Sequence, residues 1–189
     1  MTLLVLGVAL WWATHLFKRV APGARQAMQM RLGNGSKGIF ALLLVVSVVL
    51  MVLGYRRADF IPVYYPPEWG VHVTDLAMYF AIALFGLGHS KSPLRAKLRH
   101  PQLTGFSVWA ASHLLVNGDL ASLILFGGLL VWALVEIPLI NARVTDYVPY
   151  SNGTTAGTVR LAVIAAVLYV IIATIHTWLG VWPFPGARP

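Results

Sequence analysis

Residues 38–55 read GIFALLLVVSVVLMVLGY, a run of eighteen residues without a single charged side chain. An α-helix of this length crosses most of the hydrocarbon core of a bilayer, for which about 20 apolar residues are needed. Backbone amides and carbonyls in lipid must be paired within their own segment, so the run is expected to be helical. This stretch predicts an integral membrane protein.

The composition of the whole chain supports the same class. Of the 189 residues 58% are hydrophobic and 11% are charged, whereas soluble domains carry roughly 25% charged residues. The chain has no cysteine, which excludes disulfides and thiolate ligation of metals. Its net charge of +8 comes from short basic runs between apolar stretches, which is typical of membrane-protein loops and excludes nucleic acid as a partner.

Further apolar stretches have a length close to that of a membrane crossing. The predicted spans are Thr2–Phe17, Gly38–Tyr55, Val71–Gly88, Leu103–Val116, Asp119–Ile137 and Val159–Gly180. The fourth is clearly shorter than a full crossing, so five spans are the alternative to six. No internal repeat stands out. We therefore predict an all-α fold, a polytopic transmembrane helical bundle forming a single domain over residues 1–189.

The basic residues alternate between the loops. Most of the fourteen fall in the first, third and fifth loops, namely Lys18, Arg19, Arg25, Arg31, Lys37, Lys91, Arg95, Lys97, Arg99, Arg143 and Arg160. Only Arg56, Arg57 and Arg188 fall on the other side. Cytoplasmic loops carry the excess of Lys and Arg, so the N-terminus is predicted to lie outside.

Histidines within the apolar stretches are the main candidates for function, since ionisable groups inside a membrane are costly and imidazole is a common metal and haem ligand. His113 is expected well inside the fourth stretch, and a functional role is favoured there. His15 is expected in the last turn of the first span, one turn after Trp11, where a structural helix-end histidine is the alternative. His176 shares a helical face with Tyr169, and a structural hydrogen bond competes with ligation.

The segment Arg99-His100-Pro101-Gln102 introduces the fourth span. Proline is well suited to the first position of a helix. The amides of such a helix start, with Arg99 beside them, can bind an anion, either a lipid phosphate or a cofactor carboxylate. This corner is therefore a second candidate binding region.

Two polar groups are predicted to be structural. Asn117-Gly118-Asp119 reads as a tight turn between helices, with Gly118 in the left-handed region and Asp119 capping the next helix. Glu136 is expected to be the interfacial partner of Arg143.

The segments Arg99–Gly105, His113–Leu115 and Asn117–Asp119, together with Trp109, resemble the NnrU family of bacterial membrane proteins. The resemblance extends over nearly the whole chain, as far as His176-Thr177-Trp178. It implies a multi-pass protein of the bacterial inner membrane, linked to denitrification and nitric oxide metabolism. Membrane lipid and respiratory or denitrification enzymes would be its partners.

The NnrU family is similar to 15-cis-zeta-carotene isomerase, which binds haem b through histidine axial ligands. The resemblance implies haem b ligated by His15 and His113. On expected depth in the membrane alone, His113 with His176 is the competing pair. It also implies a cofactor-binding region that includes Arg99, His100, Trp109 and Asn117. By this relation the chain would be a haem-dependent isomerase acting on a hydrophobic polyene.

Two other functions stay open. The Arg-His-Pro corner also resembles isoprenylcysteine carboxyl methyltransferases, which use S-adenosylmethionine, although their later acidic pair with spaced tyrosines is missing here. A non-enzymatic assembly partner of respiratory enzymes, with merely hydrogen-bonded histidines, is the third hypothesis.

Overall fold

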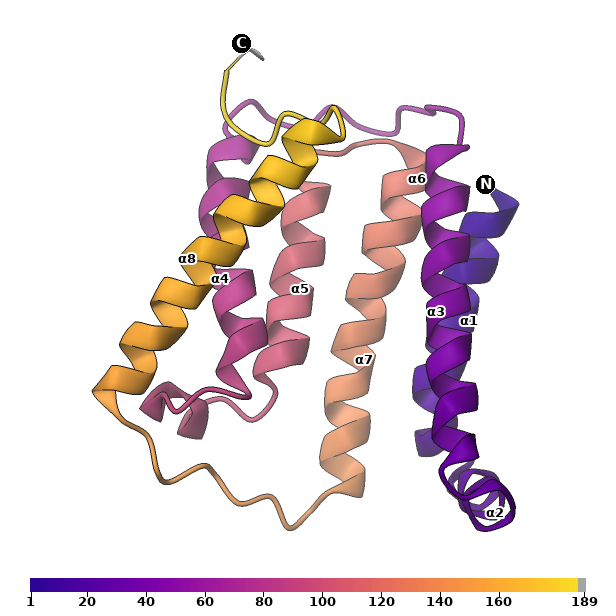
Figure 1. Ribbon diagram of the computed structural model, residues 1–189. Helices are drawn as coiled ribbons and strands as arrows, with labels where there is room; N and C mark the ends of the chain where they lie inside the picture. The colour runs from indigo at the N-terminus through magenta and orange to yellow at the C-terminus, as the bar shows by residue number, and fades with distance from the viewer. Residues whose placement is uncertain (187–189) are drawn as a thin grey trace. The chain divides into compact units, whose positions relative to one another are not determined.

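The computed structural model describes residues 1–186, and these residues are largely helical (Figure 1). The elements are α1 (Thr2–Val20), α2 (Pro22–Leu32), α3 (Gly35–Arg56), α4 (Gly70–Leu87), η1 (Pro93–Ala96), α5 (Pro101–Leu114), α6 (Leu120–Ser122), η2 (Leu123–Gly127), α7 (Gly128–Arg143) and α8 (Thr155–Trp178). Within this part of the chain there is no β-sheet. The predicted all-α membrane fold is confirmed.

Five helices of the described residues are long and apolar enough to cross a membrane: α1, α3, α4, the continuous segment Leu120–Arg143 and α8. The fourth predicted span corresponds to α5, whose 14 residues reach about 21 Å at 1.5 Å per residue. That length falls short of the roughly 30 Å hydrocarbon core. The structure therefore has five helices of spanning length and a shorter sixth. Arg188, part of the orientation argument, lies outside the described residues.

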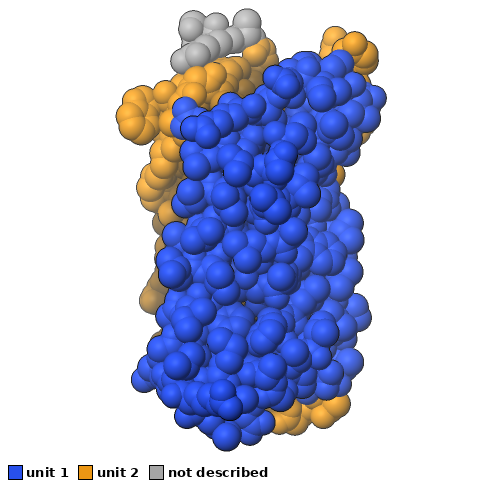
Figure 2. Space-filling model, turned by 90° about the vertical axis from the view of Figure 1, so that its right-hand side faces the viewer, with its two compact units in different colours: residues 1–64, 118–144 blue, residues 65–117, 145–189 orange. Residues whose placement is uncertain are grey.

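The chain forms two compact units that interleave in sequence (Figure 2). Unit 1 contains residues 1–64 and 118–144, and hence α1, α2, α3, α6, η2 and α7. Unit 2 contains residues 65–117 and the chain from Thr145 onward, and hence α4, η1, α5 and α8.

Unit 1 is built on a close crossing of α1 and α3. A Cβ on Gly7 would lie 2.7 Å from the backbone nitrogen of Met51, and a Cβ on Gly54 would overlap the backbone of Leu4. Small residues at such crossings allow helices in membranes to pack backbone against backbone. The short helix α2 turns steeply away from α1 (Figure 1), and Gly33, at a φ of 51°, follows its last residue.

Unit 2 is built on α4, which packs against both α5 and α8. A Cβ on Gly105 of α5 would lie 2.8 Å from the carbonyl oxygen of Ala81. The Thr74 hydroxyl donates a hydrogen bond of 2.9 Å to the Ser112 carbonyl and joins α4 to α5 again. A glycine at a helix crossing thus organises both units, and in unit 2 a hydrogen bond between helices adds to it.

The turn before α6 caps that helix as predicted. The Asp119 carboxylate accepts from the backbone N–H and the hydroxyl of Ser122. Gly118 does not adopt the expected left-handed conformation; the described glycines with positive φ are Gly33, Gly180 and Gly186. Its carbonyl instead accepts from the amides of Val63 and Tyr64, so pairing with an adjacent extended segment shapes the turn. Burial, together with the nearby Asp119, raises the pKa of the Tyr64 phenol.

Candidate histidine sites

His15 lies on α1, in unit 1. The helix continues to Val20, so His15 is not in the last turn as expected, but five residues before the end. Its Nδ1 lies 3.0 Å from the Trp11 carbonyl oxygen. A carbonyl only accepts, so Nδ1 carries the proton, and Nε2 is the lone-pair nitrogen of the neutral ring. The indole rings of Trp11 and Trp132 approach the imidazole at centroid distances of 4.2 and 4.6 Å.

An ion pair lies one helical turn beyond this aromatic cluster. Arg19 follows His15 by four residues, and Glu136 follows Trp132 by four. The Arg19 Nε lies 3.4 Å from a Glu136 carboxylate oxygen, and the Glu136 side chain is 4% exposed. The expected partner, Arg143, instead donates a 3.0 Å hydrogen bond to the Arg19 carbonyl. The prediction of a Glu136–Arg143 pair is wrong, because the rotation of α7 turns Glu136 toward α1.

His113 lies on α5, in unit 2. It was expected well inside its helix, but α5 ends at Leu114, so His113 is in the last turn. The Asn117 side-chain amide donates a 2.8 Å hydrogen bond to the His113 carbonyl, just beyond the helix end. His113 Nδ1 lies 2.9 Å from the Trp109 carbonyl oxygen, and the two rings are 5.1 Å apart. Nδ1 is again the protonated nitrogen.

The sequence segments around His15 and His113 are also similar to each other. Residues 7–17 read GVALWWATHLF and residues 105–115 read GFSVWAASHLL. The two segments share Gly, Trp, Ala, His and Leu at identical spacing, with a hydroxyl residue immediately before each histidine. An ungapped comparison of the chain with itself reveals this repeat, which was missed because the two segments are 98 positions apart and short.

Each member of the repeat has the same structural role in its own unit. Gly7 and Gly105 form the close crossings with α3 and α4. Four residues later a tryptophan supplies the carbonyl that accepts from the histidine Nδ1, and its ring contacts the imidazole. The repeat therefore defines a helix that packs by its glycine and presents an oriented imidazole two turns further on.

His176 lies on α8, in unit 2. Its Nδ1 lies 2.8 Å from the Ile172 carbonyl oxygen, which gives it the same tautomer as the other two histidines. His176 is near enough to His113 for an electrostatic interaction. Unit 2 thus brings the alternative ligand close to His113, whereas His15 belongs to unit 1.

The Arg99 corner has its expected local structure. His100 precedes α5 and Pro101 occupies its first position, as predicted. The Arg99 guanidinium lies over the Tyr147 ring, 4.9 Å from its centroid. The His100 carbonyl accepts from both the amide and the hydroxyl of Thr104. The guanidinium therefore stacks on an aromatic ring at the start of the helix that carries His113.

Within residues 1–186, no group of three or more His, Asp or Glu side chains is arranged to hold a metal ion. A haem iron differs from a bare ion in this respect, because the porphyrin supplies four nitrogen donors and the protein supplies only axial ligands. Single imidazoles with an Nε2 lone pair meet that requirement chemically.

The comparisons with known proteins identify the family. The model of the NnrU family, described as NnrU protein, matches residues 3–183 of the chain. No curated protein and no solved structure matches it. Because the match covers almost the whole of a multi-pass helical chain, the protein belongs to the NnrU family.

Proposed function

We propose that this NnrU-family protein binds haem b in the bacterial cytoplasmic membrane, with His15 and His113 as the axial ligands. The observation that carries the proposal is the shared setting of these two imidazoles. Each donates through Nδ1 to the carbonyl four residues earlier, which leaves Nε2 as the donor atom for a metal. A repeat that conserves glycine, tryptophan and histidine spacing within one chain favours a paired use of the two rings.

Other residues of the predicted region have supporting roles. Trp109 and Asn117 hold His113, the first through its carbonyl and ring, the second by capping the helix end. Arg99 and His100 lie at the opposite end of α5, where a cationic group and helix amides suit the carboxylates of a haem. When bound, haem would supply redox and gas-binding chemistry that side chains lack.

Two activities agree with such a site. Family membership supports a role in denitrification and nitric oxide metabolism, with respiratory enzymes as partners. The similarity of the family to zeta-carotene isomerase supports isomerisation of a hydrophobic polyene instead. Two imidazole ligands would favour redox chemistry over gas binding or isomerisation, either of which would require one histidine to leave the iron.

The test is the visible spectrum of the protein purified after expression with ample haem. We expect a Soret band in the wild type, and its loss or a marked shift in His15→Ala and His113→Ala. His72→Ala is the matched control, because His72 is an exposed histidine of α4. Loss in His113→Ala and His176→Ala with an unchanged His15→Ala spectrum would establish the alternative pair.

A ligand role is separated from a structural one by chemical rescue. His15→Gly and His113→Gly leave space for free imidazole, which should restore the spectrum if the ring ligates iron. Each glycine should lower the stability of its helix by about 1 kcal/mol. A colourless wild-type protein refutes the proposal. Binding of S-adenosylmethionine in calorimetry would then support the methyltransferase alternative. An unchanged phenotype of the double alanine variant would support an assembly role.

A further inference from the structure

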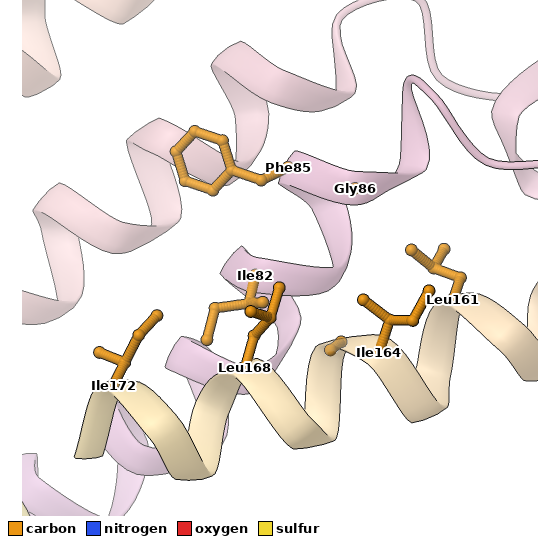
Figure 3. A pocket seen from close by; sticks show the side chains of 8 residues that line it. Ile82, Phe85, Gly86, Leu161, Ile164, Leu168 and Ile172 are labelled. Carbon is orange, nitrogen blue, oxygen red and sulfur yellow. The ribbon is translucent and has the colours of Figure 1, made fainter. Parts of the chain in front are cut away.

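An apolar groove of about 390 Å³ runs between α4 and α8 of unit 2 (Figure 3). Its lining consists of Ile82, Phe85, Gly86, Leu161, Ile164, Ala165, Leu168 and Ile172. All of these residues are apolar, and several of them are partly exposed; Ile164 is 50% exposed. The groove is therefore an open channel on the surface of the unit.

A small residue on α8 leaves part of this space open. On α4, Gly86 lets Leu161 approach closely, because a Cβ there would lie 2.9 Å from Cδ1 of Leu161. Ala165 is buried beneath the groove, so only a methyl group fills its floor. The Tyr79 hydroxyl donates a 3.3 Å hydrogen bond to the Ala162 carbonyl and ties the two helices together beside the groove. The channel is thus built into the packing of the two helices.

The dimensions of the groove match one leaflet of a bilayer. Its lining on α8 extends from Leu161 to Ile172, which corresponds to about 16 Å along the helix axis at 1.5 Å per residue. Half of a hydrocarbon core of about 30 Å is about 15 Å. An apolar channel in a membrane span is in contact with lipid tails rather than water, so a hydrocarbon chain is its natural occupant.

One end of the groove is cationic. Arg160 immediately precedes Leu161, and it lies one helical turn from Ile164 on the same face of α8. Its side chain is exposed. The charge distribution of the loops places this end of α8 on the cytoplasmic side, where anionic lipids attract basic residues.

We propose that the α4–α8 groove binds one acyl chain of an anionic phospholipid, with the phosphate bound by Arg160. The groove supplies the apolar contact along one leaflet, and the guanidinium supplies the charge and the forked donors that suit a phosphate. The assignment does not depend on haem binding.

The binding test uses the full-length protein, delipidated in a mild detergent. Dissociation constants are measured by native mass spectrometry for phosphatidylglycerol, phosphatidylcholine and diacylglycerol with identical chains. We expect the wild type to prefer phosphatidylglycerol. Arg160→Gln should weaken phosphatidylglycerol binding by about fivefold, the contribution of one basic residue near a membrane surface, and leave the binding of diacylglycerol, which has no phosphate, unchanged. Arg160→Lys should keep most of the preference, and Arg31→Gln, a charge removal on α2, should keep all of it.

The chain site is tested by filling the groove. Ile164→Trp should abolish saturable binding of all three lipids. Val167→Trp is the matched control, because Val167 is 54% exposed on α8 and does not line the groove. Leu168→Phe narrows the groove at a second point and provides the test if Ile164→Trp does not fold.

Three results would overturn the proposal. Lipid binding that is unchanged in both groove-filling variants would exclude the channel as the site. Equal affinity of the wild type for phosphatidylglycerol and diacylglycerol, with no effect of Arg160→Gln, would exclude the anionic headgroup. A neutral isoprenoid alcohol that binds the groove more tightly than phosphatidylglycerol would likewise contradict the assignment and indicate an apolar substrate.

Discussion

Removal of either member of the Arg19–Glu136 pair should strongly destabilise unit 1. The two side chains are 17% and 4% exposed, at an N–O distance of 3.4 Å. Breaking a buried pair leaves an uncompensated charge, at a cost of about 3–5 kcal/mol in the free energy of unfolding. We expect about 3 kcal/mol for Glu136→Ala, because Arg19 lies next to the end of α1 and its long stem can carry the charge toward the interface.

Arg19→Ala should cost more, about 4–5 kcal/mol, because Glu136 is nearly inaccessible on α7 and has a short side chain. Replacing both residues by apolar ones of similar volume, as in Arg19→Met with Glu136→Leu, should return the free energy of unfolding to within about 1 kcal/mol of the wild type. The double variant should thus be more stable than either single variant.

The assay is equilibrium unfolding in mixed detergent micelles, followed by circular dichroism and tryptophan fluorescence. Arg31→Ala is the control for loss of a positive charge at an exposed site and should stay within about 0.5 kcal/mol. Single variants that cost less than about 1 kcal/mol, or a double variant that equals the sum of the two, would refute the reasoning, since both results would mean that the pair is solvated.

Two further predictions concern a helix crossing and the Tyr64 phenol. Gly105→Ala should lower the free energy of unfolding by about 1–3 kcal/mol, because its methyl group would lie 2.8 Å from the Ala81 carbonyl oxygen. The control Gly127→Ala, in open surroundings, should be neutral or stabilising by up to about 1 kcal/mol. Equal changes in the free energy of unfolding of the two variants would contradict this. Asp119→Asn should lower the pKa of Tyr64, because the carboxylate no longer opposes the phenolate. The measurement is an ultraviolet titration of tyrosinate, and an unchanged midpoint for Tyr64 would contradict the prediction.

The membrane class and most helix positions could be predicted from the sequence because they depend on local composition. A run such as residues 38–55 is too apolar to be exposed to water, and in lipid it must be helical so that its backbone groups are hydrogen-bonded. The capping of α6 by Asp119 was equally predictable, since the hydrogen bond to Ser122 spans only three residues.

The candidate site was only partly accessible from sequence. His15 and His113 could be singled out as costly polar residues, and the repeat around them could also have been found. Their tautomer follows from an intrahelical bond to the residue four positions earlier, so it is local as well. Whether the two rings ligate one haem remains a prediction that the spectra will test.

The sequence by itself determined the helical spans, the basic loops and the local geometry of each imidazole, because all of these arise within a few residues of one another. Only the tertiary structure decided that Glu136 pairs with Arg19, that Gly7 and Gly105 form the crossings, and that α4 and α8 leave a groove. The physical reason is that membrane spans are apolar on every side, so their periodicity does not reveal the packed face. Rotation and register of neighbouring helices then set the contacts, and these exist only when the helices are assembled.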